Sequence, residues 1–484
     1  MSINDIREPA LGAGPALYAR GADAAGLRLS LVAVTRAGAE APRLEAEGAE
    51  PVSLALRAEL FDHAVWGAEF SLPVGPDAGY RLDGKRFPVV TDLSGDVAIG
   101  FVSCNGQEKG DEARSHEDRD VMWRRLAAEH RTRPFVLLLH GGDQLYADEA
   151  VEAHPETRRW AGLSIDDKPG VAWTPDMEDA VRGYFFRRYL ALMRQPAFAE
   201  LAACVPSLMI WDDHDIFDGW GSHPAGLQES PVALGLFRAA REMFVLFQLG
   251  ADPAALPSTC RDRTGASFSQ DARFPGFCVL LPDLRSERTP ERVMGPEGWA
   301  AFEAGLGAAP DGDRRIVVSS VPALGPRLSL VEALLDLYPG QQQYEDDLRD
   351  QWQSRGHRAE WVRFLSSLER EAVERGGPVT VVSGEIHLAT RGEMRLSDGT
   401  SLHQLVASGI THPKPPAAMA VGLGFLSRLG HAPLPGRPIR LKRLPGQGAV
   451  YTAERNYLVL RRRAGHWTAA WELEESGRTP EIGL

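Results

Sequence analysis

The chain has 484 residues, of which 44% are hydrophobic and 25% are charged. At about 150 residues per domain, this length predicts two to three domains, and the composition excludes a disordered protein. The net charge is −13, from 53 Lys and Arg against 66 Asp and Glu, which excludes a general electrostatic attraction to nucleic acid or an anionic membrane. An anionic ligand would therefore need a local positive charge, such as a metal ion or an arginine pair.

The cysteines and the N-terminus indicate the compartment. Cys104, Cys204, Cys260 and Cys278 show no spacing typical of a disulfide framework, and we interpret them as thiols in a reducing compartment. The first twenty residues contain no basic stretch followed by an apolar stretch, so no secretory signal is predicted. No window approaches the run of about 20 apolar residues that a membrane helix needs. We therefore expect a cytoplasmic protein without membrane contact.

The first part of the chain predicts a small β-sandwich-like domain over residues 1–92. Residues 27–34 and 52–60 are alternating or continuous apolar runs, separated by stretches rich in Ala, Gly, Glu and Pro that are typical of turns. Turn dipeptides within 76–88 are expected to lead out of this domain.

From about residue 93 onward, short apolar runs alternate with helical stretches, a pattern typical of an α/β fold. The predicted strands lie within 96–105, 134–143, 205–215, 276–288, 314–322, 378–387 and 402–412. Helical spacing in 181–195 and 232–250 predicts a helical insert over 181–250 in a catalytic domain at 93–425, and 358–375 predicts another helix. Residues 454–475 predict a hairpin that turns at Ala464-Gly465, in a C-terminal region (426–484) expected to complete the core sheet.

Polar clusters follow nearly every predicted strand of the α/β part. They are Cys104-Asn105, His140 to Gln144, Asp212 to Asp215, Asp283 to Arg285, Glu385 to His387, and Ser408 to His412. Ligands of open α/β sheets bind outside the carboxyl ends of the strands. We therefore expect these side chains to meet at one edge of the sheet.

The residue types in these clusters favour a site for two metals. Carboxylates, a thiolate, a phenolate and imidazoles can hold one hard trivalent or borderline metal and a second, oxygen-preferring one. Metals about 3.5–4 Å apart can bind a phosphoryl group and deprotonate a water. Asp143 is the best bridging candidate, because the preceding Gly-Gly pair allows a close approach of the backbone, and Tyr146 could reach the same metal. The alternatives are a helix N-cap for Asp143 and a small buried hydrophobe for Cys104.

Several of these segments resemble the PhoD-like metallophosphatases, the alkaline phosphatase D family of the calcineurin-like metallophosphoesterase superfamily. They are SCN (103–105), HGGDQLYAD (140–148), WDDHDIFDGWGS (211–222), PDLRSER (282–288) and SGEIH (383–387). Residues 346–361 and 454–460 look like family features too, so the similarity covers roughly 93–475 in the same order. The resemblance implies an α/β class with a four-layer α/β/β/α core. It also implies hydrolysis of phosphate monoesters or diesters by a metal-bound hydroxide at a di- or trinuclear site.

The resemblance also implies roles for individual residues. Cys104 and Tyr146 would bind Fe³⁺, and Asp143 would bridge the metals. Asp213 would bind the second metal, and His214 would protonate the leaving group or steady the phosphate. Glu385 and His387 match an Asp-x-His element, with Glu in place of Asp. The second metal would be Ca²⁺, with Mn²⁺, Mg²⁺ or Zn²⁺ as alternatives.

Asn105, Arg285 and His412 are candidates for substrate binding. For Arg285, an ion pair with Asp283 or Glu287 is an equal alternative. The expected partner is a small phosphate ester rather than nucleic acid. The choice between monoester and diester stays open, and no protein partner is inferred. The rival interpretation is a catalytically silent metal- or phosphate-binding regulatory module of the same fold.

Overall fold

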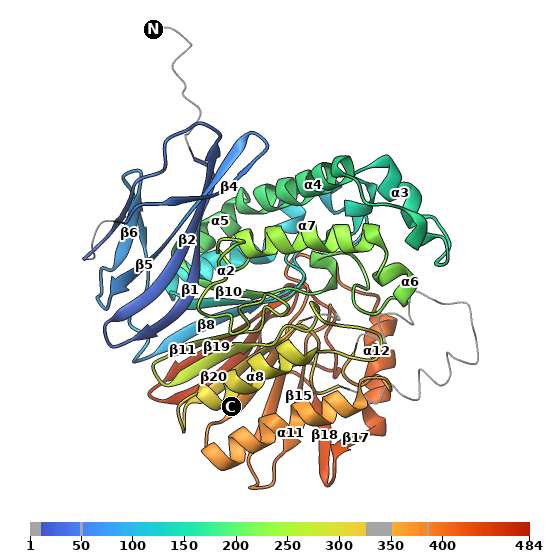
Figure 1. Cartoon of the computed structure of the whole chain (residues 1–484). Helices are drawn as coiled ribbons and strands as arrows, with labels where there is room; N and C mark the ends of the chain where they lie inside the picture. The colour runs from blue at the N-terminus through green and yellow to red at the C-terminus, as the bar shows by residue number, and fades with distance from the viewer. Residues whose placement is uncertain (1–10, 49–51, 326–350, 385–386) are drawn as a thin grey trace.

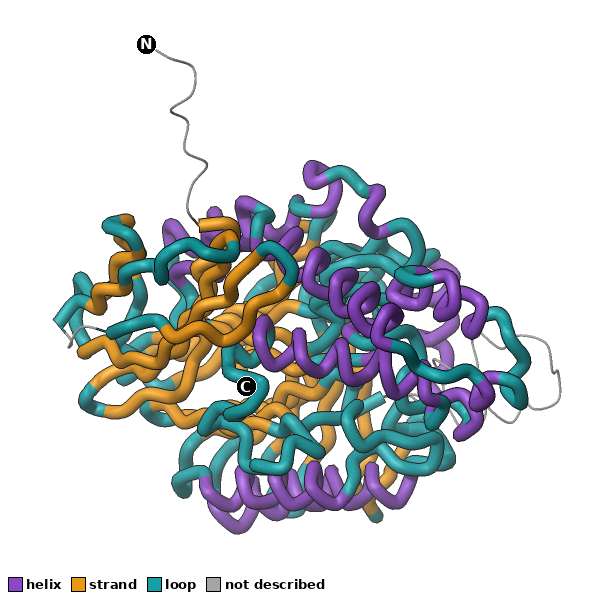
Figure 2. Tube along the Cα trace, turned by 45° about the horizontal axis from the view of Figure 1, so that its top comes forward, coloured by secondary structure: helices purple, strands orange, loops and turns teal. Residues whose placement is uncertain are grey.

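The computed structural model describes residues 11–48, 52–325, 351–384 and 387–484. Two β-sheets pack against each other between two groups of helices, as Figure 1 shows, and Figure 2 shows the strands enclosed between helices. This arrangement confirms the predicted mixed α/β class with a four-layer core.

Eleven strands of the described residues form the first sheet, in the order β21-β20-β19-β8-β9-β10-β1-β2-β5-β4, with β22 beside β20. Strands β8, β9, β10 and β1 run parallel to one another, and the other neighbours are antiparallel. The bounds are β1 Leu11–Asp23, β2 Gly26–Arg36, β4 Ala55–Leu60, β5 His63–Pro73, β8 Val97–Val102, β9 Leu137–Gly141, β10 Ser207–Ile210, β19 Asn456–Arg463, β20 His466–Leu473, β21 Gly477–Arg478 and β22 Ile482–Gly483.

The second sheet has eight strands within the described ranges, in the order β11-β12-β13-β14-β16-β15-β18-β17. Its centre, β12-β13-β14-β16, is parallel, and most residues of these strands are buried because layers cover both faces. The bounds are β11 Gln270–Phe274, β12 Phe277–Leu281, β13 Arg314–Ser319, β14 Val379–Ser383, β15 Thr390–Arg395, β16 Ser401–Val406, β17 His431–Leu434 and β18 Arg437–Lys442.

Helices cover the outer face of each sheet. The first sheet carries α2 (Val121–Thr132), α4 (Pro175–Met193), α5 (Pro196–Cys204) and α7 (Pro231–Phe247), and the second carries α8 (Pro296–Ala308) and α11 (Arg358–Arg375) (Figure 1). Both α4 and α7 begin with proline after a capping Thr174 or Ser230, whose side chain accepts a backbone N–H of the first turn. The other α-helices of the described residues are α1 His116–Arg119, α3 Pro155–Ala161, α6 Ala225–Gln228 and α12 Ala417–Leu426. Within the described ranges, no helix has the length and apolar character that a membrane span requires.

The N-terminal strands belong to the first sheet. Strand β1 pairs in parallel with β10, with Tyr18 opposite Ser207, and continues through β2 to β5 and β4. A small sheet of β3 (Leu44–Ala46), β6 (Gly79–Leu82) and β7 (Lys85–Pro88) lies against this extension, where Tyr80 contacts Phe70 at 5.9 Å between ring centroids. One continuous sheet therefore crosses the boundary predicted at residue 92, and β1 is the connecting strand.

The predicted helical insert over 181–250 also differs from the structure. The range contains β10, a central strand of the first sheet, with α4 and α5 before it and α7 after it. All three helices are part of the covering layer rather than one inserted unit. In the C-terminal region, β19 pairs with β8 and β20 pairs with β19, whereas β17 and β18 join the second sheet. The hairpin turn at Ala464-Gly465 has φ of 46° and 82°, which suits a two-residue turn.

Candidate metal centre

The predicted site residues follow the carboxyl ends of the parallel strands. Cys104 follows β8, Asp143 follows β9, Asp213 and His214 follow β10, and His387 follows β14. The backbone N–H groups of Cys104 and Asn105 donate to the carbonyls of Gly142 and Asp143 at 3.2 and 2.7 Å. These hydrogen bonds link the first two loops directly.

Three residues of this edge have an unusual backbone. Cys104, Asp143 and His387 have φ of 53°, 54° and 50°, and they are half of the six non-glycine residues with positive φ in the described chain. This conformation costs about 1–3 kcal/mol at each such residue and concentrates at functional sites. Gly142, with φ of 100°, has no space for a side chain, since a Cβ would lie 2.7 Å from the Cβ of Asp212. The Gly-Gly pair therefore allows the close approach that the sequence predicts.

Asp143 lies at the centre of the cluster. Its Oδ2 is 3.5 Å from Cys104 Sγ and 3.4 Å from Tyr146 Oη, while Ser408 Oγ donates to Cys104 Sγ at 3.1 Å. Its Oδ1 is buried and has no hydrogen-bond partner among the described residues. A carboxylate with a thiol and a phenol at one oxygen and a vacant lone pair at the other can bridge two cations.

The acidic residues of this edge carry more negative charge than the protein compensates. Burial raises the pKa of Asp143 well above its usual value, and Asp212, Asp213 and Asp215 raise it further against the effect of His214. Burial also raises the pKa of Asp215 to about 7. For Asp213 burial acts in the same direction, but Arg285 and His214 outweigh it and lower the pKa to about 2. Such a cluster is a suitable site for a cation.

The donor atoms fit more than one metal ion. Three groups have ligand-type atoms within 4.8 Å of one another, namely Asp143 with Asp212 and Asp213, Asp213 with His214 and Asp218, and Glu108 with His387 and His412. Together with Cys104 and Tyr146 they provide thiolate, phenolate, carboxylate and imidazole ligands. This mixture suits a trivalent or borderline ion beside an oxygen-preferring one.

His214 is held between Asp148 and Tyr146. Its Nδ1 lies 2.9 and 3.0 Å from the two carboxylate oxygens of Asp148, and its ring stacks on Tyr146 at 4.3 Å. Burial alone would lower the pKa of His214, but Asp148 and Asp213 outweigh it and raise the pKa well above its usual value. The side chain is 12% exposed, so His214 is oriented and still accessible.

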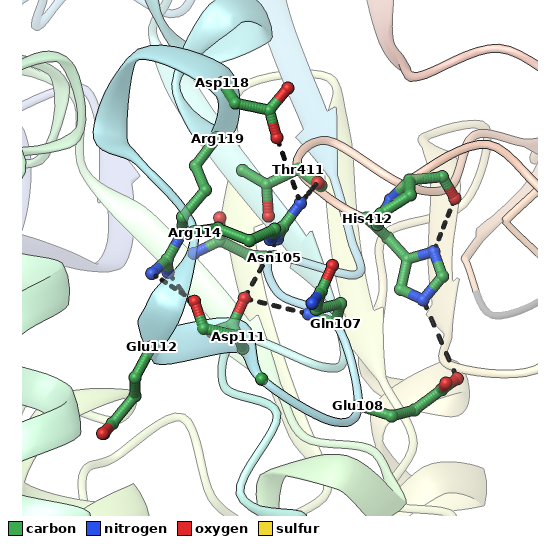
Figure 3. A network of polar contacts seen from close by, with 12 residues as sticks. Asn105, Gln107, Glu108, Asp111, Glu112, Arg114, Asp118, Arg119, Thr411 and His412 are labelled. Atoms are coloured by element: carbon green, nitrogen blue, oxygen red, sulfur yellow. Dashed lines mark hydrogen bonds and ion pairs between the residues drawn. The ribbon is translucent and has the colours of Figure 1, made fainter.

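His387 and His412 form a stacked pair near Tyr146, with ring centroids 6.3 and 5.4 Å from that of Tyr146. Their rings are parallel within 5°, with centroids 3.4 Å apart. Burial, then His412 and His214, lower the pKa of His387, and its Nδ1 is buried without a hydrogen-bond partner in the described chain. Glu108 Oε1 lies 3.8 Å from His412 Nε2, as the dashed line in Figure 3 marks. A neutral imidazole with an unused nitrogen is a suitable metal ligand.

The structure places two predicted substrate-binding residues, Asn105 and Arg285, in buried positions. Asn105 is 2% exposed, its Oδ1 accepts the Trp123 indole N–H at 2.8 Å, and its Nδ2 donates to the Gln144 carbonyl at 3.4 Å. Arg285 is fully buried, where it donates to Asp212 and lies 3.3 Å from Asp213. Arg285 is therefore ion-paired with Asp212 and Asp213, instead of with the Asp283 or Glu287 considered from the sequence. Glu385 lies outside the described residues.

Sequence reasoning missed the roles of Asp148 and Glu108. Asp148 lies in the same short motif as Asp143 and Tyr146, but its contact to His214 spans 66 positions. Its position two residues after Tyr146, at the start of the 3-10 turn Asp148–Glu152, was the available signal. Glu108 lies in a loop without a recognisable pattern, so no sequence signal could have identified it.

The fold and the residues at this edge define a metallophosphoesterase-like α/β protein. In solved structures, similar folds are found in PhoD, with a TM-score of 0.60 at 13% identity over 97% of this chain and 89% of that one. Another is the purple acid phosphatase PPD1 from seeds of yellow lupin (Lupinus luteus), with a TM-score of 0.53 at 10% identity over 96% and 73% of the two chains. At these identities the likeness concerns the fold alone.

The family model described as PhoD related phosphatase matches residues 102–340. The matched range includes Cys104, Asp143, Tyr146 and His214 and agrees with the resemblance that the motifs indicate. A curated relative, the uncharacterized protein YGR266W of Saccharomyces cerevisiae, is 24% identical over 443 residues, or 73% of this chain. The aligned region spans 62% of that relative's length.

Proposed function

We propose that the protein hydrolyses small phosphate esters at a centre of two or more metals bridged by Asp143. The observation that carries the proposal is the position of the Asp143 carboxylate, with Cys104 Sγ and Tyr146 Oη at 3.5 and 3.4 Å from Oδ2 and a buried, unused Oδ1. The match to the PhoD-related phosphatases supports the reaction class.

The side chains divide into two ligand sets. Cys104 and Tyr146 would hold Fe³⁺ with one oxygen of Asp143, because thiolate and phenolate suit a trivalent iron. Asp213 and His387 would hold a divalent metal with the other oxygen, together with Glu385 as the sequence motif suggests. Ca²⁺ is the first choice for this position, and Mn²⁺, Mg²⁺ and Zn²⁺ are alternatives. When bound, the metals would supply positive charge to the phosphoryl group and lower the pKa of an attacking water.

His214 would serve the leaving group. Its Nδ1 faces Asp148 at 2.9 Å, so the orientation of the ring is set and Nε2 is the nitrogen left to deliver a proton to the departing alkoxide. His412, whose side chain is 12% exposed and which stacks on His387, would contact the bound phosphate.

The test is a paired assay of p-nitrophenyl phosphate and its bis ester with metal analysis of the same preparation. Wild type is expected to contain iron and a divalent metal and to hydrolyse at least one ester. Asp143→Asn should lower the rate by at least about a hundredfold with unchanged circular dichroism. Asp166→Asn, at an exposed aspartate with no hydrogen bond or ion pair to the described part of the chain, is the matched control and should leave the rate unchanged.

The relative rates on the two esters decide between monoesterase and diesterase. Absence of turnover with both esters after addition of Fe³⁺ and each divalent metal would contradict the proposal and favour a silent metal- or phosphate-binding module.

A further inference from the structure

A second cavity lies beside the metal centre, between α4 and residues 105–119. Its volume is about 340 Å³, at the lower end of the range of about 300–1,000 Å³ that is typical of small-molecule sites. Asn105, Gln144 and Leu145 form part of its wall, and they follow Cys104 and Asp143 closely in the chain. The cavity and the metal centre therefore share two loops.

Positive side chains dominate the lining of this cavity, which we name the arginine cavity. The charged and titratable residues that line it are Arg114, His116, Arg119, Arg187, Arg188 and Glu112. Four guanidinium groups thus face one carboxylate, in a chain with a net charge of −13. This local reversal of sign needs an explanation.

Asp111, behind the lining, compensates only part of this charge. It is fully buried, accepts hydrogen bonds from Arg114 at 3.0 Å and Arg188 at 2.5 Å, and lies 3.4 Å from Arg119. Figure 3 shows Asp111 between Arg114 and Arg119. One carboxylate cannot neutralise three guanidinium groups.

Two further acids contribute little. Glu112 lies 3.5 Å from Arg188 and Asp118 lies 3.8 Å from Arg114, but their side chains are 58% and 56% exposed. Water screens ion pairs with such exposed partners. Burial lowers the pKa of Arg119, and Arg188 and Arg114 lower it further against the effects of Asp111 and Asp120. In contrast, burial alone would lower the pKa of Arg188, but Tyr184, Asp111 and Glu112 outweigh it and raise the pKa.

Several donors of the arginine cavity are unused. The Nε groups of Arg114 and Arg119 are buried without a hydrogen-bond partner among the described residues. Arg187 is exposed at the cavity, with no hydrogen bond or ion pair to the described part of the chain. An anion with several acceptor oxygens in the cavity would give the exposed guanidinium of Arg187 a partner.

We propose that the arginine cavity binds a phosphate or carboxylate group at a site distinct from the metal centre. Two sources share this chemistry, namely a second anionic group of the substrate and a free anion. Arg114 donates to the carbonyl of Thr411 at 2.7 Å, and Thr411 precedes His412 of the metal centre, so a bound anion would also stabilise the loop that carries His412. Binding of a second anionic group of the substrate rests on the proposed function, whereas binding of a free anion does not.

The first test is a calorimetric titration of the full-length, metal-loaded protein with inorganic phosphate. Two bound equivalents are expected, one at the metals and one in the arginine cavity. Arg187→Gln should weaken one of them about three- to tenfold, Arg187→Glu should weaken it more, and Arg187→Lys should restore most of it. Arg238→Gln, at an exposed arginine of α7 that does not line the cavity, should leave both equivalents unchanged.

The outcomes separate this inference from the proposed function. A single equivalent that Arg187→Gln weakens would support the arginine cavity and contradict phosphate binding at the metals. Phosphate binding that is the same in wild type, Arg187→Gln and Arg187→Glu would overturn the inference and leave the proposed function untouched.

The second test identifies the source of the anion. We compare KM for hexyl phosphate and hexanediol bisphosphate, which differ only in the second phosphate. If the cavity binds the substrate, Arg187→Gln raises KM for the bisphosphate about threefold or more relative to KM for hexyl phosphate. If it binds a free anion, the ratio of the two KM values is the same in both proteins while phosphate binding is still weakened. If Arg187→Gln changes neither the ratio of the two KM values nor the binding of phosphate, the cavity binds neither a second group of the substrate nor a free anion.

Discussion

The carboxylate of Asp148 faces the imidazole of His214 with both oxygens, at 2.9 and 3.0 Å from Nδ1. Asp148 also accepts the backbone N–H of Asp218 at 2.8 Å. One side chain therefore ties the turn after Tyr146 to two positions of the loop that follows β10, His214 and Asp218. The orientation of His214 depends on this contact, because Tyr146 restrains only the plane of the ring.

Replacement of Asp148 tests this orientation. Asp148→Asn retains a polar group but loses the charge, and it is expected to lower kcat about 10- to 100-fold with little change in KM. Steady-state kinetics with p-nitrophenyl phosphate measures the effect. Glu152→Gln, on the same turn but 54% exposed, serves as the control and should keep the wild-type rate. Equal rates in both variants would contradict a role for Asp148 in positioning His214.

The charge excess around Asp143 predicts opposite effects on stability with and without metal. In chelator, Asp143→Asn is expected to raise Tm, because it removes one of several mutually repelling buried carboxylates and stabilises the protein by about 1–3 kcal/mol. The addition of metals should raise the Tm of wild type by more than it raises the Tm of the variant, since bound ligands stabilise the folded state. Thermal melts in the two conditions measure the difference. A lower Tm of the variant in chelator would show that the cluster is not destabilised by its own charge.

Gly106 is expected to control the position of Tyr146. A Cβ at residue 106 would lie 2.5 Å from Tyr146 Cδ2 and 3.1 Å from its Cβ, so Gly106→Ala must displace the ring. We expect loss of iron from the purified protein and a destabilisation of about 1–3 kcal/mol. Metal analysis and denaturant unfolding are the measurements. Gly95→Ala, where no atom lies within 4 Å of the added Cβ, is the control. Full iron content in Gly106→Ala would argue against Tyr146 as an iron ligand.

His140 predicts a pH dependence of stability. Its ring is buried between Gln144 and Ser207, and burial lowers its pKa to about 4, against about 6.5 in an unfolded chain. Between pH 6.5 and 4 the unfolded state binds more protons, so the free energy of unfolding falls as the pH falls. The stability that depends on a neutral His140 is present in full above about pH 6.5. Near pH 4, about 3 kcal/mol of it has been lost.

Denaturant unfolding of wild type and His140→Gln at several pH values isolates this contribution. As the pH falls from 7 to 4.5, the free energy of unfolding of wild type should fall by more than that of His140→Gln. The difference between the two proteins therefore changes in favour of the variant. A difference that is constant over this range would show that His140 does not titrate as its burial requires.

The sequence predicted the central strands well because their signal is local. Apolar residues dominate the runs that contain β8, β9, β10, β12, β13 and β14, and each run is followed by polar residues. Strand β1 escaped detection, since Gly12, Gly14 and Gly21 interrupt its apolar pattern. Its place in the sheet comes from pairing with β10, almost two hundred residues away, which no local pattern contains.

The distinction between local sequence signals and contacts between distant residues also applies to the site. Asp143, Tyr146 and Cys104 were recognisable because each follows a strand within a short motif, whereas the buried positions of Asn105 and Arg285 depend on Trp123 and Asp212 from other elements. The arginine cavity likewise combines α4 with residues 105–119. Charge composition alone gave no indication of it in an acidic chain.

The parallel pairing of β1 with β10 has a consequence for biosynthesis. The three strands that carry Cys104, Asp143 and Asp213 are bordered by β1 from the beginning of the described chain and by β19 from near its end. A nascent chain on the ribosome therefore leaves β8 with an open edge until β19 has emerged. Metal loading at the finished centre must then follow translation, and a fragment of residues 93–425 is expected to aggregate through its two uncovered strand edges.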